Sequence, residues 1–262
     1  TGDGYCDQQM FWYVSPLQIL RRSKFKTFKK YGVIMGLVFD IEQPTIPVEG
    51  SDDAYAVRRI YCVGRNYAAH AREMGHDPDR EPPFFFMKPA DAIVPSGATI
   101  PFPPKTEDLH HEIELVVAIG KGGANISEAD ALEHVYGYCV GLDMTRRDVQ
   151  AQAKEMRRPW DMGKGFDNSA PVTTLKTVEQ VGHPDQGAIW VKVNGEMKQE
   201  GDLNQHIWDV KETISYLSGL VELAPGDLIM MGTPAGVGPV PRGGKLEGHV
   251  DGVGDLTVSY GS

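Results

Sequence analysis

Two glutamates one residue apart, Glu112 and Glu114, are the side chains whose types and spacing most directly suggest chemistry. They lie near the start of an apolar run, 109–120, in which the alternation of apolar residues and the abundance of β-branched ones predict one strand. Residues two apart on a strand project to the same face, so these carboxylates lie side by side. Adjacent buried like charges are unfavourable unless a cation lies between them.

A third carboxylate, Asp143, directly follows another apolar segment, 136–142. A set of three carboxylates without thiolate or imidazole suits a hard cation. The sequence therefore predicts a Mg²⁺ or Mn²⁺ site held by Glu112, Glu114 and Asp143, with water in the open positions. The alternative is a solvated strand face, which is the commoner environment of an isolated Glu-x-Glu pair.

Composition excludes several classes of protein. The 262 residues carry a net charge of −10 without a basic stripe in the body of the chain, which argues against nucleic acid as a partner. No apolar run reaches the length of a membrane span. Three cysteines, Cys6, Cys62 and Cys139, have no metal-site spacing and form a poor disulfide framework, so a reducing cytoplasm is expected. Cys62 and Cys139 lie in apolar contexts that favour packing over nucleophilic roles.

The first 34 residues differ from the rest of the sequence in carrying more basic than acidic side chains. A natural start at Met35 favours an upstream extension, read-through or vector-derived, that is not part of the fold. A targeting peptide of the mitochondrial type and a membrane-surface helix are the second and third interpretations. Residues 35–262 are predicted to form a single catalytic domain.

The remaining elements predict a fold in which strands dominate. Many short strands, few helices and turns rich in glycine and proline indicate an α+β fold built on mixed sheets. Asn194-Gly195 predicts a type I′ hairpin turn. A helix over 145–156 is expected to place Arg147, Gln150 and Lys154 at i, i+3 and i+7.

A short helix over 66–74 would bring His70 and Glu73 to one face, because they are three residues apart. A surface ion pair is the structural alternative for these two side chains. The Gly64 and Gly75 that flank the segment, and the proline-containing loop after it, would let it move.

Seven short motifs occur in the order found in the fumarylacetoacetate hydrolase family; they are 64–67, 70–74, 86–89, 111–114, 142–148, 164–167 and 232–234. The sequence resembles this family over about residues 58–260. It is most similar to the short, single-domain branch that contains acylpyruvases and fumarylpyruvate hydrolases. The resemblance implies a β-rich roll of mixed sheets, of the family's C-terminal-domain type, and a homodimer. Enzymes of this family open carbon–carbon bonds of β-diketo acids.

The resemblance also implies roles for individual residues. His70 and Glu73 match a lid dyad that activates water, and Lys164 matches a cation that stabilises the leaving enolate. Glu112, Glu114 and Asp143 match the metal ligands. The positions that match substrate-binding residues are Arg65, Lys88, Gln150 and Thr233.

These roles predict a metal-dependent hydrolase that acts on a small anionic 2,4-diketo acid. Fumarylpyruvate is the expected substrate, because Arg65, Lys88 and Lys164 could engage a second carboxylate beyond the pyruvyl end. Decarboxylation of oxaloacetate, or enol–keto tautomerisation, needs no attacking water and is the alternative activity. An isomerase acting on an unsaturated acid is a further rival. A metal-stabilised binding protein without catalysis is the remote one, and the His70–Glu73 pair argues against it.

Overall fold

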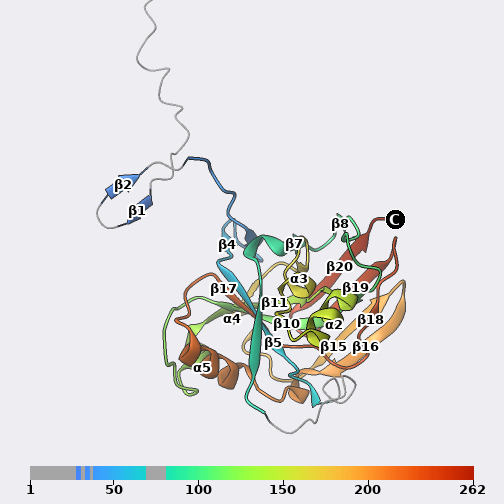
Figure 1. The fold of residues 1–262 in the computed structure, drawn as a ribbon. Coiled ribbons are helices and arrows are strands. Elements are labelled where there is room, and N and C mark those ends of the chain that lie inside the picture. Colours follow the sequence, from blue (N-terminus) through green and yellow to red (C-terminus); the bar gives the residue numbers. More distant parts are fainter. Residues whose placement is uncertain (1–27, 31–32, 36–37, 69–80) are drawn as a thin grey trace, which may run out of the picture. The chain divides into compact units, whose positions relative to one another are not determined.

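The structure, a computed structural model, describes residues 28–30, 33–35, 38–68 and 81–262 (Figure 1). The chain divides into two compact units, Thr1–Glu42 and Gln43–Ser262. In the first unit, β1 (Phe28–Lys30) pairs antiparallel with β2 (Val33–Met35). The proposed domain start at residue 35 stays a prediction. Within the described part of the chain, no helix has the length and apolar character that a membrane crossing requires.

The main sheet of the second unit is mixed. Its strands run in the order β6-β5-β17-β10-β11-β13-β7, with β14 also paired to β11. The pairs β5–β17 and β7–β13 are parallel, and the other pairs are antiparallel. The strands are β5 (Arg59–Gly64), β6 (Phe84–Lys88), β7 (Ile93–Pro95), β10 (Ile113–Ile119), β11 (Val135–Leu142), β13 (Ala170–Val172), β14 (Lys176–Thr177) and β17 (Asp227–Met230).

Three smaller sheets contain the other strands described in this unit. A five-stranded sheet has the order β16-β15-β19-β20-β8, a three-stranded sheet has the order β12-β9-β18, and β3 pairs with β4. Their bounds are β3 (Thr45–Pro47), β4 (Ala54–Ala56), β8 (Thr99–Ile100), β9 (Leu109–His111), β12 (Thr145–Arg146), β15 (Ala188–Val193), β16 (Glu196–Asp202), β18 (Gly238–Pro239), β19 (Lys245–Val250) and β20 (Gly254–Tyr260).

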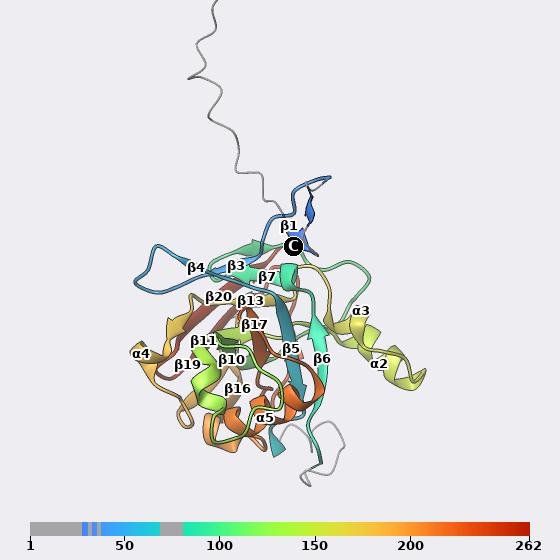
Figure 2. The ribbon, with the colours of Figure 1, turned by 90° about the vertical axis from the view of Figure 1, so that its left-hand side faces the viewer.

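Helices are short and few among the described residues, which confirms the predicted α+β class. Figure 2 shows α2 and α3 together on one side of the second unit, and α5 on another. Asp209 and Glu212 form a reciprocal capping box at the start of α5. The helices are α2 (Arg147–Glu155), α3 (Asp161–Lys164), α4 (Val178–Val181) and α5 (Val210–Leu220), with 3₁₀ turns η2 (Ala90–Ala92), η3 (Ala131–His134) and η4 (Leu203–Gln205).

Strand β10 lies at the centre of the main sheet and is buried on both faces. Leu115 and Val117 pack into a core shared with the five-stranded sheet and α5. Val116 and Ala118 face a second core, which includes Ile46 of β3. Burial of each large apolar side chain of this kind stabilises the fold by roughly 1.5–3 kcal/mol. The strand that begins beside the glutamates is therefore a rigid part of the molecule.

Two local predictions have different outcomes. The hairpin turn is confirmed, because Asn194 and Gly195 both have positive φ, as a type I′ turn requires. The single strand expected over 109–120 is wrong. The run forms two strands that are separated at Glu112. The first, β9, pairs with β12 and β18 in the small sheet, whereas the second, β10, pairs with β11 and β17 in the main sheet.

The buried imidazole of His206 is expected to lower the stability of the fold in acid. Its ring packs edge-on against Tyr67, with the centroids 4.6 Å apart, and its buried Nε2 has no hydrogen-bond partner among the described residues. Burial lowers the pKa of His206 to about 4. The unfolded chain takes up this proton near pH 6.5 and the folded chain only near 4, so stability falls between those values, by up to about 3 kcal/mol.

We expect His206→Phe to reduce the fall in the free energy of unfolding between pH 6.5 and 4. Above pH 7 the histidine is neutral in both states, so loss of its titration should not change stability there. The measurement is the difference in free energy of unfolding between the metal-free variant and metal-free wild type across pH 4–8. The difference should shift in favour of the variant as the pH falls. A difference that does not change with pH would show that His206 does not titrate in this way.

Candidate active site and metal centre

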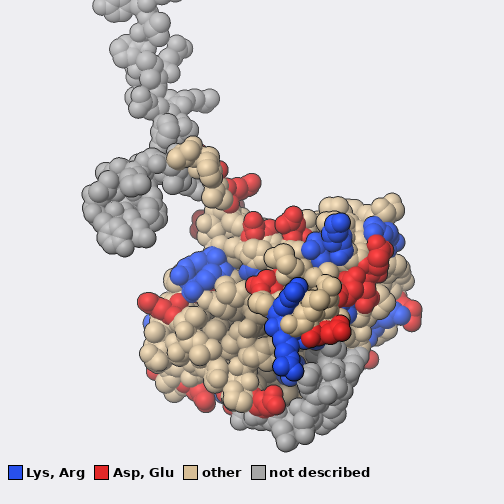
Figure 3. Space-filling view, viewed as in Figure 1, with Lys and Arg blue, Asp and Glu red and all other residues tan. Residues whose placement is uncertain are grey.

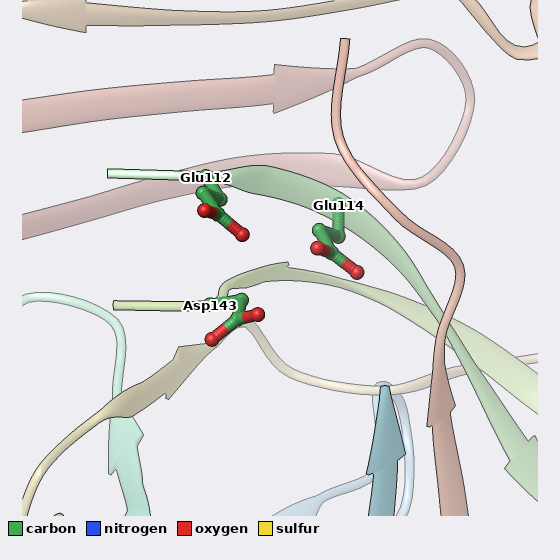
Figure 4. A group of neighbouring side chains, drawn as sticks. All are labelled: Glu112, Glu114 and Asp143. Atoms are coloured by element: carbon green, nitrogen blue, oxygen red, sulfur yellow. The ribbon is translucent and has the colours of Figure 1, made fainter. Parts of the chain in front are cut away.

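The pairing of β10 with β11 brings the three predicted metal ligands together. Ile113 lies opposite Leu142 in this antiparallel pair, so Glu112 and Asp143 meet where the strands end. The backbone N–H of Asp143 donates to the Glu112 carbonyl at 2.8 Å. Figure 4 shows the side chains of Glu112, Glu114 and Asp143 converging on one space. Carboxylate oxygens from the three residues lie within 4.8 Å of one another.

All three carboxylates are buried, and burial makes the cluster electrostatically demanding. Desolvation, reinforced by repulsion from Asp143 and Glu112, raises the pKa of Glu114 well above its usual range. The N–H of Gly232 donates to Glu114 Oε2 at 2.7 Å and opposes this effect. One buried oxygen, Asp143 Oδ1, lies 2.8 Å from the ammonium of Lys88 but accepts no hydrogen bond from the described residues. A buried cluster of carboxylates, in which one oxygen accepts no hydrogen bond, fits a divalent cation of the Mg²⁺ or Mn²⁺ type.

The ammonium group of Lys164 lies against the cluster, where it was predicted. Its Nζ donates to Glu112 Oε2 at 2.7 Å and to Asp143 Oδ2 at 2.6 Å. Although burial opposes it, attraction by Asp143 and Glu112 raises the pKa of Lys164, so the group stays protonated. Arg147, on α2, forms a second cationic contact with Glu112, through Oε1.

Lys88 is more deeply placed than a substrate contact would require. Only 1% of its surface is exposed, and it does not line the pocket above the carboxylates. Its Nζ lies 2.8 Å from Asp143 Oδ1, without hydrogen-bond geometry, and donates to the carbonyl oxygens of Met144 and Lys164. The ammonium group therefore holds Asp143 and the two backbone segments beside it.

A pocket opens over the carboxylates, between the ends of the strands and α2. Aromatic residues form part of its wall, with Arg65 over the ring of Phe84 and Lys154 over the ring of Trp160. Arg65 and Lys154 have no carboxylate partner among the described residues. Desolvation, followed by repulsion from Arg147 and Arg65, lowers the pKa of Lys154. The mouth of the pocket thus holds positive charge that an anionic ligand can neutralise.

On the face seen in Figure 3, which carries α2 and α3, basic and acidic side chains alternate. No extended area of a single charge sign is visible among the described residues of this face.

Two other predicted contacts line the same pocket. Gln150, on α2, accepts a hydrogen bond from Arg147 at 2.7 Å. Thr233 lies in the loop after β17, and its Oγ1 accepts from Gln199 Nε2 at 2.7 Å. Arg65, Gln150 and Thr233 therefore lie where a ligand above the carboxylates would touch them.

The predicted water-activating pair, His70 and Glu73, lies outside the described residues, so its role stays a prediction. The two cysteines expected to be packing residues are buried and free. Burial raises the pKa of the Cys139 thiol to about 12 and that of Cys62 well above its usual range, which agrees with inert thiols.

Three lining residues and one supporting residue were not assigned to the site from sequence. For Arg147 and Lys154, the helical spacing that they share with Gln150 was a usable signal. Trp160 could have been placed near the site, because it directly precedes α3, which ends at Lys164. Gln199 gave no signal, because it reaches the site only through the folding of a distant segment. These four residues are Arg147, Lys154, Trp160 and Gln199.

Comparison with known proteins gives consistent relatives. Residues 59–259 match the family model described as fumarylacetoacetate (FAA) hydrolase C-terminal. The mitochondrial oxaloacetate tautomerase of Mus musculus is 43% identical over 196 residues, which cover 75% of this chain and 88% of the relative. The fumarylpyruvate hydrolase of a Ralstonia species is 44% identical over 190 residues, which cover 72% of this chain and 98% of the relative.

A solved structure extends this similarity to three dimensions. The crystal structure of fumarylpyruvate hydrolase from Pseudomonas aeruginosa in complex with Mn²⁺ and pyruvate superimposes with a TM-score of 0.84 and 56% sequence identity. The match covers 86% of this chain and 99% of that one. The similarity confirms the β-roll expected from the sequence.

Proposed function

Because this chain belongs to the fumarylacetoacetate hydrolase C-terminal family, we propose that it is a metal-dependent hydrolase that cleaves the carbon–carbon bond of a 2,4-diketo acid. Fumarylpyruvate is the proposed substrate, with fumarate and pyruvate as products. The observation that carries this proposal is the buried cluster of Glu112, Glu114 and Asp143 beneath a pocket with a cationic mouth.

The metal centre supports this chemistry in type and position. Glu112, Glu114 and Asp143 would hold Mg²⁺ or Mn²⁺, which when bound supplies Lewis acidity toward the oxygens of the pyruvyl end. A relative of known structure contains Mn²⁺ together with pyruvate, the product proposed here. Lys88 is assigned to positioning of Asp143, in place of the substrate contact expected from sequence.

The chain's own groups supply the remaining steps. His70, oriented by Glu73, takes a proton from water as the water oxygen adds to the distal acyl carbonyl. The carbon–carbon bond then breaks, its electron pair leaves with the pyruvyl half as the enolate, and the acyl half retains the added oxygen as fumarate. The ammonium of Lys164, which donates to Glu112 and Asp143, would favour this developing negative charge. Protonation of the enolate gives pyruvate.

The dicarboxylate preference rests on the pocket mouth. Of the three cations expected from sequence to bind the second carboxylate, Lys88 and Lys164 already donate to protein acceptors, which leaves Arg65. Lys154, which was not in that set, is the second candidate. Fumarylpyruvate carries a second carboxylate at the end of its acyl half, whereas acetylpyruvate has none. Arg65 and Lys154 are the groups placed to pair with it.

We expect Lys154→Met to lower kcat/KM for fumarylpyruvate by about tenfold, mostly through KM, because it removes one charged hydrogen bond to the distal carboxylate. Acetylpyruvate should be cleaved as before. Steady-state kinetics on both substrates measure this, with the exposed Lys211→Met as the matched control. Equal losses on the two substrates would show that Lys154 does not read the distal carboxylate.

A second candidate activity is enol–keto tautomerisation or decarboxylation of oxaloacetate. Relatives described as mitochondrial oxaloacetate tautomerase share 41–43% identity with this chain, close to the 44% of the fumarylpyruvate hydrolase relative. These reactions use the same cationic and carboxylate groups at the 2-oxo acid end. Neither requires an attacking water.

The two candidates separate in a direct screen. Release of pyruvate, release of CO₂ and loss of enol absorbance would be followed with fumarylpyruvate, acetylpyruvate and oxaloacetate, each with Mg²⁺ or Mn²⁺. We expect pyruvate release from fumarylpyruvate to be the fastest reaction. Faster turnover of oxaloacetate would overturn the hydrolase assignment, and turnover that survives exhaustive chelation would overturn the metal assignment.

A further inference from the structure

Gln199 is a buried polar side chain on a strand whose other residues are exposed or half-buried. It lies on β16, at the edge of the five-stranded sheet, and only 1% of its surface is exposed. From there its amide reaches the start of β10 and the loop after β17. A buried amide at an edge strand is costly unless every donor and acceptor is paired.

All four hydrogen-bonding positions of this amide are paired. Oε1 accepts from the N–H of Ile113 at 3.1 Å and from His111 Nδ1 at 2.8 Å. Nε2 donates to Pro234 O and to Thr233 Oγ1, each at 2.7 Å. The orientation of the amide is unambiguous, because a backbone N–H only donates and a carbonyl oxygen only accepts.

This fixed orientation determines what the hydroxyl of Thr233 can do. Since Gln199 Nε2 donates to Thr233 Oγ1, the threonine oxygen acts as acceptor on that side and its own proton must point elsewhere. No described residue accepts that proton. Thr233 is 2% exposed and lines the pocket above the carboxylates, so the remaining direction is toward bound ligand.

We propose that Gln199 is a positioning residue that presents the Thr233 hydroxyl as an obligate hydrogen-bond donor to a carboxylate or carbonyl oxygen of the substrate. The inference rests on the proposed function for the class of ligand, a 2-oxo acid. Gln199 itself does not touch substrate. It acts through Thr233 by removing the alternative in which the hydroxyl donates its proton to the protein.

The same amide sets the distance between this donor and the metal ligands. Ile113, which donates to Gln199, lies between Glu112 and Glu114, and Gly232 beside Thr233 donates to Glu114. The loop also lies directly on β16, where a Cβ at Gly236 would come within 2.1 Å of the Lys198 carbonyl oxygen. Loop and carboxylates are thus joined on both sides, so the donor is preorganised.

The test reverses the hydrogen bond while keeping the shape of the side chain. In Gln199→Glu, a carboxylate oxygen faces Thr233 and accepts its proton, so the hydroxyl is lost to the ligand. We expect Gln199→Glu and Thr233→Val each to weaken pyruvate binding to the Mn²⁺-loaded protein by roughly 10- to 100-fold, the effect of one hydrogen bond to a charged group. In the double variant, Gln199→Glu should weaken pyruvate binding by less than about threefold beyond the effect of Thr233→Val alone. Calorimetric titration with pyruvate measures all four proteins.

Gln199→Met provides a second, uncharged variant if the glutamate variant fails to fold. It should also weaken pyruvate binding, and again much less when combined with Thr233→Val. Thr233→Ser, which keeps the hydroxyl, should lose far less affinity than Thr233→Val. Melting temperatures report the purely structural effect of the Gln199 substitutions. We expect these substitutions to lower the melting temperature equally in proteins with Thr233 and in proteins with Thr233→Val.

Independent, multiplying losses in the double variants would overturn the proposal, because Gln199 would then act without Thr233. Equal affinities of Thr233→Ser and Thr233→Val would overturn it as well. Because the readout is binding of pyruvate and not turnover, a protein that binds pyruvate through Thr233 and Gln199 but does not cleave fumarylpyruvate would refute the proposed function alone.

Discussion

Replacement of Glu114 by glutamine should abolish divalent-dependent activity, with a loss of about 10³-fold or more, while the protein stays folded. Two carboxylates and an amide in this cluster compete poorly with water for Mg²⁺. The amide keeps the shape of the side chain and can still accept from the N–H of Gly232.

The fold should tolerate this change in the absence of metal. The raised pKa of Glu114 shows that its charge is costly in the buried cluster, so a neutral side chain removes repulsion with Asp143 and Glu112. We expect the metal-free variant to melt at or above the temperature of metal-free wild type at pH 8. Addition of Mn²⁺ should raise the melting temperature of wild type and leave that of Glu114→Gln nearly unchanged.

Activity and thermal melting with and without Mn²⁺ measure this prediction, and the half-exposed Glu247→Gln serves as the matched control. Wild-type activity and melting temperature that do not respond to chelation would remove the metal site from the account. A Glu114→Gln variant that keeps its response to Mn²⁺ would show that this carboxylate is not a ligand.

Replacement of His70 by alanine should separate hydrolysis from the alternative reactions. We expect hydrolysis of fumarylpyruvate to fall by about 10² to 10⁴, the usual range for loss of a general base. Decarboxylation of oxaloacetate should fall much less, because that reaction uses an electron sink and no attacking water. The prediction rests on the match of His70 and Glu73 to the family's lid dyad.

Glu73→Gln should behave as a milder form of His70→Ala, because it weakens the orientation of the imidazole without removing it. Rates of pyruvate and CO₂ release from both variants, measured with saturating Mn²⁺, provide the comparison. Parallel losses of both activities in His70→Ala would make the pair a latch for the segment and exclude its role in water activation.

The three candidate metal ligands could be singled out from sequence because their signal is largely local. Two carboxylates two residues apart in an apolar run predict side chains on one face, and the carboxylates of Glu112 and Glu114 do lie together, although the strand is interrupted at Glu112. The type of the residues then selected a hard cation. Asp143 needed one further step, the pairing of β10 with β11, and the structure brings it to Glu112 through the register of Ile113 with Leu142.

The order of the seven motifs determined the family, and with it the β-roll that the comparisons confirm. The spacing of Arg147, Gln150 and Lys154 likewise predicted one helix face, and α2 presents all three to the pocket. These inferences succeeded because helical and strand periodicities are properties of consecutive residues.

Only the tertiary structure decided which cations remain available to a ligand. Lys88 was expected to touch substrate. Its ammonium instead forms an ion pair with Asp143 and donates to two carbonyl oxygens, because Lys88 ends β6 beneath the cluster. Lys154, by contrast, lines the pocket, with its ammonium over the ring of Trp160.

Tertiary structure also decided the break of the strand at Glu112 and the placement of Gln199. The break follows from competition between two sheets for the residues on either side of Glu112. Gln199 meets Ile113 and Thr233 across separations of 86 and 34 residues. Hydrogen bonds of this kind depend on how sheets pack, and no periodicity in the sequence encodes that packing.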